Sequence, residues 1–273
     1  MPAGLQTVSF FKQTLAAGGS FEALAPATGD SATFFNVPQD SLPYLAEVWG
    51  VDDASAALIS LHGTRFHDQS VGMLFAVPPA LTQNSGFISS LGSPAGADQR
   101  IYPSDVLTVS ANGTNGDNVN VTIILYYPNL PGISARLYTW DAIRSNIKYL
   151  HGVQVAVTAG AGDYGTSAAL NSTQNDLHAN KDYALLGFTS DVPLSSVVVQ
   201  GIDTGNLRVG FPVIADPAHD AYAFRDLAMT YNAPLIPVIN ANNAGNVLVQ
   251  AADTAGSTAN VVVQLAELET NVA

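Results

Sequence analysis

The chain has 273 residues, of which 47% are hydrophobic and 11% are charged. This length allows one large domain or two ordinary ones, and the apolar content is sufficient for packed cores, which argues against disorder. Nine basic against 22 acidic residues give a net charge of −13, which repels phosphate backbones and excludes direct nucleic-acid binding from the expected functions. The absence of cysteine excludes disulfides and thiolate metal sites.

The first twelve residues lack the basic region and the apolar run of a signal peptide, and no apolar stretch reaches the length of a membrane span. These features predict a soluble, unprocessed chain.

Short apolar runs bounded by Gly, Pro, Asn and Asp dominate the sequence. This pattern is typical of β-sandwiches and barrels and differs from the longer period of alternating βα units. In the first half we expect strands at residues 8–15, 21–24, 33–37, 46–51, 57–61, 71–77, 106–111 and 119–127. In the second half we expect them at 154–158, 184–189, 196–202, 207–211, 235–240, 247–251 and 260–266. Eight and seven strands are close to what two jelly rolls need.

One or two short helices accompany the strands. Residues 222–231 place apolar side chains at the i, i+3, i+4, i+7 spacing of one helix face. Residues 137–150 have a weaker stripe of the same kind and are also compatible with a strand or with the joint between two domains. The two prolines and the glycine of 128–132 indicate a boundary, so we expect one domain over 1–130 and a second over 133–273.

A pattern in the first half recurs in the second. Residues 106–125 align with 247–265 at offsets of 141 and then 140 residues, with one deletion in the turn. A second match pairs 48–52 with 199–203 at an offset of 151, and a longer connection at 78–103 would account for the difference. We interpret both as an internal duplication of one β-domain. The first alignment matches Val106, Leu107, Ala111, Gly116, Asn120, Val121 and Leu125 with Val247, Leu248, Ala252, Gly256, Asn260, Val261 and Leu265.

Residues 160–165 spell GAGDYG, a GxGxxG directly after a predicted strand. Alone, this motif indicates a dinucleotide site, with Asp182 or Asp191 as the ribose ligand. However, the polar stretch 166–180 offers little apolar face for a helix, and no βα alternation follows. We therefore interpret the motif as a glycine-rich loop between two strands.

The five histidines are dispersed, at positions 62, 67, 151, 178 and 219, and only His62 and His67 are close together. No HxH pair of the kind that binds a metal from one strand face is present. His67 beside Asp68 could form an acid/base pair, but we expect surface or capped histidines, and the metal ligands stay unassigned.

No GxSxG, HExxH or Walker sequence occurs, so we expect no catalytic residues, no enzyme activity and no cofactor. The paired carboxylates Asp52-Asp53 and Glu267-x-Glu269 are expected to diverge. The Asx-rich turn 112–118 could hold a structural calcium ion, although such a turn needs none.

A chain of two fused β-barrels that is acidic, free of cysteine and without a catalytic constellation resembles the double jelly-roll major capsid proteins of tailless icosahedral viruses and phages. The resemblance is architectural, spans nearly the whole chain and rests on the two pairings above. It implies all-β tandem jelly-roll barrels and a homotrimer that forms a pseudo-hexagonal capsomer and tiles an icosahedral shell. Its implied partners are neighbouring capsomers, other virion proteins and a lipid membrane beneath the shell. The implied location is the virion, after a soluble stage in the host cytoplasm.

If the chain assembles in this way, aromatic side chains in loops are candidate intersubunit anchors, namely Tyr102, Tyr164 and Tyr222. The apolar-basic residues 10–12 are either part of a first strand or a contact at a subunit or inner surface. Two alternatives stay open. One is a non-enzymatic β-sandwich binding module such as a viral spike or adhesin, and the other is an enzyme or dinucleotide binder on a β-scaffold.

Overall fold

The computed structural model describes residues 3–16, 20–30, 44–52, 57–63, 73–77, 107–174, 176–213 and 220–272. These residues lie mostly in β-strands with a few short helices, which confirms the all-β class. The strands form four sheets, two from each half of the chain. None of the helices in these ranges is long and apolar enough to cross a membrane.

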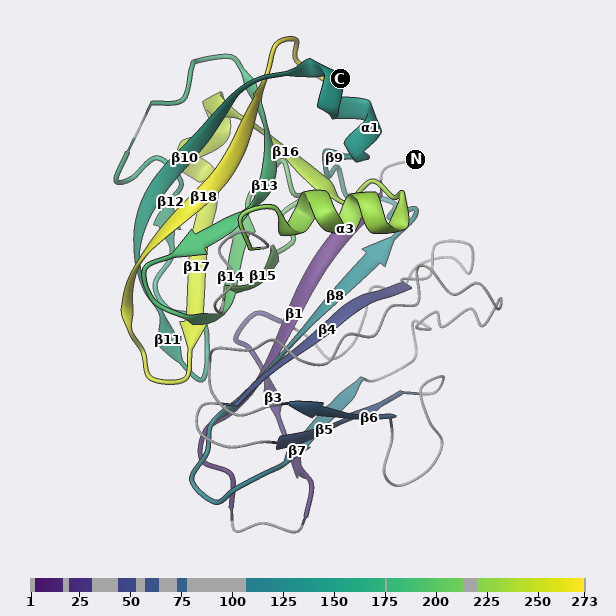
Figure 1. The fold of residues 1–273 in the computed structure, drawn as a ribbon, viewed down its shortest axis with the longest axis vertical. Coiled ribbons are helices and arrows are strands. Elements are labelled where there is room, and N and C mark those ends of the chain that lie inside the picture. The colour runs from purple at the N-terminus through teal and green to yellow at the C-terminus, as the bar shows by residue number, and fades with distance from the viewer. Residues whose placement is uncertain are drawn as a thin grey trace.

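The first half contains two four-stranded antiparallel sheets that pack face to face (Figure 1). The first has the order β3 (Ala25–Pro26), β1 (Gly4–Lys12), β8 (Val119–Tyr127) and β4 (Tyr44–Asp52). The second has the order β2 (Glu22–Ala23), β7 (Thr108–Asn112), β5 (Ala57–His62) and β6 (Met73–Val77). The buried side chains between them, such as Val8, Ile59 and Val121, form the core of this half.

The second half repeats this arrangement with five-stranded sheets. One has the order β10 (Ile147–Thr158), β18 (Thr258–Leu268), β13 (Asp182–Ser190), β16 (Ile236–Asn240) and β9 (Leu137–Tyr138). The other contains β11 (Gly160–Ala161), β17 (Leu248–Asp253), β14 (Leu194–Gln200), β15 (Val209–Val213) and, also beside β17, β12 (Ala168–Ala169). No sheet closes on itself among the described strands, so each half is an open sandwich.

Helix α3 (Ala223–Tyr231) confirms the helix expected at 222–231. It buries Phe224 against the rings of Phe188 and Phe211, with centroids 5.9 and 4.5 Å apart. It ends at Asn232, which adopts the left-handed conformation with φ 47°. The apolar face that the spacing predicts covers the core of the second sandwich.

The segment 137–150 is not one helix. It contains β9, the four-residue helix α1 (Trp140–Ile143), the 3-10 turn η2 (Arg144–Asn146) and the start of β10. The Thr139 hydroxyl accepts a hydrogen bond from the Ala142 N–H and caps α1. From Ile147 onward the segment is a strand, because pairing with β18 satisfies its backbone hydrogen-bonding groups. A second 3-10 turn, η3 (Ala241–Asn246), links β16 to β17.

The aligned segments 106–125 and 247–265 fall on equivalent pairs of consecutive strands, β7 and β8 in the first half and β17 and β18 in the second, and in each pair the chain crosses from one sheet to the other. Val121 and Leu125 are buried in the first core, and their counterparts Val261 and Leu265 are buried in the second. Both turns contain a glycine with positive φ, Gly116 at 97° and Gly256 at 83°. The match is imperfect at its start, because Leu107 is 1% exposed and Leu248 is 37% exposed.

The pairing of 48–52 with 199–203 is wrong. Residues 48–52 belong to β4, which pairs with β8. Residues 199–200 end β14, which pairs with β17. In the alignment β8 corresponds to β18 and β7 to β17, so β4 and β14 lie in sheets that do not correspond. The equivalent of β4 by position is β13. A Val-x-Gly match in a chain rich in valine and glycine arises by chance, because one short strand sequence fits many pleated surfaces.

Several expectations concern residues outside the described ranges, among them the strand at 33–37 and the connection at 78–103. The expected boundary at 130–133 lies in the connection between β8 and β9.

Candidate functional site

The two halves meet through the outer face of the sheet that contains β1 and β8. Along β8, Ile123 and Leu125 belong to the core of the first half, whereas Ile124 and Tyr126 belong to the core of the second. Leu5 of β1 also belongs to the second core. Alternate residues of a strand point to opposite faces, so the second half covers the face of β8 that the first half leaves open. Figure 1 shows β1, β8 and β4 between the small sheet of the first half and the second half.

Buried polar groups within this join are paired across it. The Tyr164 hydroxyl lies 2.7 Å from the Ser9 Oγ and 2.9 Å from the Ser196 Oγ. The Thr7 Oγ1 donates to the Gly210 carbonyl at 3.0 Å and accepts from the Gly210 N–H at 2.9 Å. Burial raises the pKa of the Tyr164 phenol. Because unpaired buried polar groups are costly, this network favours one relative position of the two halves.

An ionic group borders the join. The Arg208 Nη1 donates to the Asp30 Oδ1 and to the Thr28 carbonyl, both at 2.9 Å, and the guanidinium lies over the Tyr164 ring at 4.7 Å from its centroid. Burial raises the pKa of Asp30 more than the Ser9 N–H and Arg208 lower it. A partly buried ion pair of this kind adds geometric specificity to the apolar contact.

The GxGxxG segment begins in the two-residue strand β11, which pairs with β17, and continues as a loop that contacts the first half, so the loop interpretation holds for residues 162–165 only. Asp163 accepts hydrogen bonds from the Thr28 N–H, at 3.0 Å, and from the Thr28 hydroxyl. A Cβ on Gly165 would lie 1.8 Å from the Thr158 carbonyl oxygen, so glycine is required by the tight turn. No helix follows within described residues 166–174 and 176–181. Without a helix N-terminus the loop lacks the anion site of a dinucleotide fold.

The two carboxylates considered as ribose ligands are used inside the chain. Asp182 is fully buried and pairs with Arg136 at 2.6 and 3.0 Å. Burial would raise the Asp182 pKa, but the hydrogen bonds from Arg136 and Asn240 and the charge of Arg136 together outweigh it, so the pKa is lowered. Asp191 accepts hydrogen bonds from the backbone and side chain of Asn260. Both groups stabilise the fold instead of facing a ligand.

The candidate anchors are engaged within one chain. Tyr164 packs edge-on against Phe11 between the two halves, with the ring centroids 6.0 Å apart, so it is not available as an intersubunit anchor. Tyr222 precedes α3 with the Arg225 guanidinium 4.2 Å from its ring centroid. Residues 10–12 belong to β1, with the two phenylalanines buried, and Tyr102 lies outside the described residues. The strand interpretation of residues 10–12 is therefore the better one.

Two oxygen atoms of the turn 112–118 accept hydrogen bonds from the segment after β1, whereas the Asp117 Oδ2 is buried without a hydrogen-bond partner. The Asn118 Oδ1 accepts a hydrogen bond from the Thr14 N–H at 3.0 Å, and the Asp117 carbonyl accepts one from the Leu15 N–H at 2.9 Å. These bonds hold the turn against residues 14 and 15, which follow β1. His62 ends β5, whereas His67, Asp68 and Asp53 lie outside the described residues.

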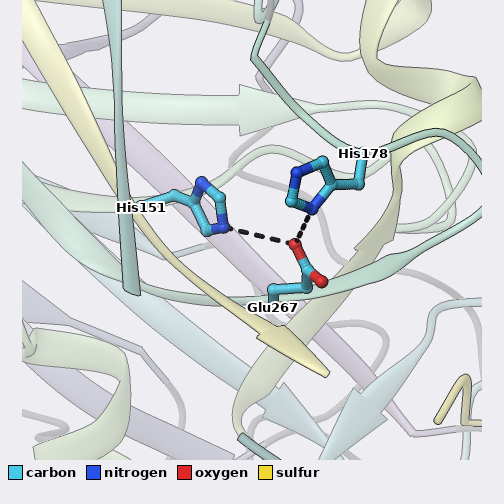
Figure 2. Close-up of side chains that lie close together, drawn as sticks. All are labelled: His151, His178 and Glu267. Carbon is cyan, nitrogen blue, oxygen red and sulfur yellow. Dashed lines mark hydrogen bonds and ion pairs between the residues drawn. The ribbon is translucent and has the colours of Figure 1, made fainter. Parts of the chain in front are cut away.

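A group of metal-ligating side chains that the sequence did not reveal lies at one end of the second sandwich. It consists of His151 on β10, Glu267 on β18 and His178 in the connection before β13 (Figure 2). It is the one cluster of three or more potential ligands found in the described part of the chain. His151 continues the inward-facing positions of β10, and Glu267 continues those of β18. Glu269 is exposed beyond the strand, so the Glu267-x-Glu269 pair does not converge.

The Glu267 carboxylate is the centre of this group. Its Oε2 lies 2.6 Å from the His178 Nδ1 and 3.3 Å from the His151 Nε2, and it accepts a hydrogen bond from the Tyr183 hydroxyl at 3.0 Å. The Glu267 side chain is 2% exposed and that of His178 is 60% exposed. Burial would raise the Glu267 pKa, but hydrogen bonds from His178 and Tyr183 outweigh it and the pKa is lowered. Burial raises the pKa of Tyr183 to about 12.

Comparisons with known proteins identify no family. No protein-family model matches the chain, and no curated protein matches it significantly. Among solved structures, the protein YhaK from Escherichia coli is similar at 10% identity over 95% of this chain and 85% of that one, with a TM-score of 0.22. The 7S globulin of Momordica charantia is similar at 10% identity over 85% and 70%, with a TM-score of 0.19. Scores this low carry no conclusion about fold or function.

Proposed function

We propose that this chain is a structural assembly protein, a double jelly-roll major capsid subunit. In this proposal three copies form a pseudo-hexagonal capsomer, and capsomers tile an icosahedral shell. The proposal places the protein in a virion, with neighbouring capsomers, other virion proteins and a lipid membrane beneath the shell as partners. It assigns no enzymatic activity and no direct contact with nucleic acid, in line with the net charge of −13.

The observation that carries the proposal is the nested strand pairing in both halves. In the second half, when the two-residue strands β9 and β11 are left out, the first of the eight remaining strands pairs with the last, the second with the seventh, the third with the sixth and the fourth with the fifth. These pairs are β10·β18, β12·β17, β13·β16 and β14·β15. A jelly roll is one long antiparallel hairpin wrapped into two sheets and has this order of pairs, so the pairing supports the proposal.

The first half contains three of the same nested pairs among its described strands. β1 pairs with β8, β2 with β7 and β5 with β6. Two units with one topology in one chain favour a protein that uses repeated geometry, because a trimer of such a chain presents six similar units around its axis.

The join between the halves supports the same conclusion. The second core includes side chains of β1 and β8, and buried hydroxyls cross between the halves. A capsid subunit of this type needs its two units in one fixed relative position. Because side chains of the first half are packed into the core of the second, the contact between the halves provides this rigidity.

Exposed apolar side chains on the sheets could form lateral contacts between copies of the chain. Leu58 and Leu74, at 43% and 46% exposed, lie on the outer surface of the sheet β2-β7-β5-β6. Tyr149 and Leu150, at 49% and 64%, lie on the edge strand β10. Apolar groups gathered on sheet faces and edges are typical of surfaces that assemble.

Light scattering on the purified protein, followed by electron microscopy under assembly conditions, tests the proposal. We expect a trimer at three times 28.4 kDa and closed particles or flat hexagonal arrays. A monomer at all concentrations would refute the proposal. A stable trimer that never forms sheets or shells would favour the spike or adhesin alternative.

A further inference from the structure

We infer that His151, His178 and Glu267 form a site for a divalent transition-metal ion, with zinc as the best-matched ion. The ion would fasten the connection before β13, residues 176–181, to the end of the β10–β18 pair. This inference does not depend on the assembly proposed above.

The spacing of the three groups fits one shared ion. Each residue offers one ligand atom, and the three atoms lie within 4.8 Å of one another. Ligand distances of about 2.0–2.2 Å around a tetrahedral zinc ion place neighbouring donor atoms about 3.3 Å apart. The His151 Nε2 and the Glu267 Oε2 already have this separation, at 3.3 Å. The His178 Nδ1, at 2.6 Å from the same oxygen, needs a small outward movement, and its exposed side chain has room to make it.

A buried nitrogen at the centre of the group has no hydrogen-bond partner. The His151 Nε2 is shielded from solvent and makes no hydrogen bond. Its contact with the Glu267 Oε2 at 3.3 Å, drawn as a dashed line in Figure 2, is an ion pair only when the ring is protonated. An unpaired nitrogen lone pair in a buried position is unfavourable unless it binds a proton donor or a metal ion. A metal ion coordinated by this nitrogen would satisfy it.

Outer contacts hold the carboxylate in place, as in established metal sites. The Tyr183 hydroxyl donates to the Glu267 Oε2 at 3.0 Å and accepts from the backbone N–H of His178 at 2.7 Å. Tyr183 lies directly opposite Glu267 on the neighbouring strand. Partners of this type orient the ligands of a metal centre and tune its affinity.

The chemistry of the donors selects the ion. Two imidazole nitrogens and one carboxylate oxygen suit zinc and its first-row neighbours, whereas calcium and magnesium prefer sets made of oxygen alone. A divalent ion would also compensate the charge of a carboxylate that is 2% exposed. Three protein ligands leave a fourth position, and the exposure of His178 leaves that position open to water.

The test uses the full chain after treatment with a chelator. Zinc is titrated by calorimetry and in competition with a chromogenic chelator, and cobalt(II) is titrated as a spectroscopic probe. We expect one equivalent of zinc per chain, a higher melting temperature with zinc and a visible cobalt spectrum typical of tetrahedral coordination. His178→Gln removes an exposed ligand without changing the core, so zinc affinity should fall at least tenfold and the cobalt spectrum should be lost. Glu267→Gln should have the same effect.

His62→Gln is the matched control, because His62 lies on β5 in the other sandwich. It should bind zinc with wild-type affinity and stoichiometry. The inference is overturned if the wild-type chain binds no zinc saturably, or if His178→Gln binds it as tightly as the wild type. In that case the group is a plain hydrogen-bonded histidine–glutamate pair.

Discussion

Glu47 provides the sharpest test of the join between the halves. It lies on β4 and is 6% exposed, with its Oε2 accepting a hydrogen bond from the Trp49 Nε1 at 2.9 Å. Helix α3 packs nearby and places Asp226 on the same hollow, with its carboxylate held by Arg225 at 2.7 Å. Burial raises the pKa of Glu47 from 4.5 to about 8, although the hydrogen bond from Trp49 lowers it in part. The carboxyl group is therefore largely neutral in the folded protein at neutral pH.

The sign of the effect follows from the two pKa values. In the unfolded chain Glu47 ionises at its ordinary value of 4.5, so unfolding releases a proton between pH 4.5 and 8. The stability of the fold is unaffected by this group below pH 4.5 and falls as the pH rises toward 8. At 1.36 kcal/mol per pKa unit, the loss is about 3 kcal/mol at pH 7 and about 5 kcal/mol above pH 9.

Glu47→Gln removes the ionisation and keeps an amide oxygen for the Trp49 N–H. We expect the variant to gain about 3 kcal/mol in free energy of unfolding at pH 7 and little or nothing at pH 4. Urea titrations at pH 4, 7 and 9, followed by tryptophan fluorescence, measure the difference. Glu269→Gln changes an exposed carboxylate and is the control. A parallel pH dependence of the wild-type and Glu47→Gln proteins would refute the reasoning.

Three further predictions address the two cores, the join and a turn. Leu125→Ala and Leu265→Ala should each lower the free energy of unfolding by about 2–5 kcal/mol. Amide hydrogen exchange should become faster mainly in the half that carries the substitution. Equal changes in both halves would contradict two separate cores. Tyr164→Phe leaves the two serine hydroxyls of the join without their shared partner and should cost about 1–2 kcal/mol, and an unchanged melting temperature would show that the network is dispensable. Gly116→Ala meets no atom within 4 Å but must adopt a φ of 97°, so urea unfolding should show a loss of about 1–2 kcal/mol from backbone strain alone.

The strands were largely predictable because their apolar runs are short and bounded by turn residues. The prediction for 119–127 coincides with β8, and the helix at 222–231 agrees with α3 within one residue. The region 137–150 was not predictable in detail, because pairing with β18 overrides its helical spacing from residue 147 onward. The match of 48–52 to 199–203 failed because a five-residue similarity does not identify which strand of a sheet it belongs to.

The metal-ligating group was hidden by distance along the chain. His151 precedes His178 by 27 residues, and Glu267 follows 89 residues later, so no local spacing connects them. A weaker signal was available in two strands. The inward positions of β10 run from Val157 to Val153 and continue to His151, and those of β18 continue from Leu265 to Glu267. A polar side chain that continues an apolar face on two paired strands indicates a buried polar group at the end of a sandwich.

The composition of β8 also explains why the two halves belong together. A strand of an isolated sandwich alternates apolar and polar side chains, because one of its faces meets water. In β8 every residue is buried, and the outward positions carry the polar Asn120 and Thr122 followed by the apolar Ile124 and Tyr126. Separated from the second half, this face would expose both apolar side chains to water, together with Leu5 of β1. The surfaces of the two halves are therefore not equivalent, because the second half covers the outer face of β8. A covered face of this kind favours a rigid two-unit block over two sandwiches on a flexible linker, and a rigid block is the geometry that the proposed capsid tile would require.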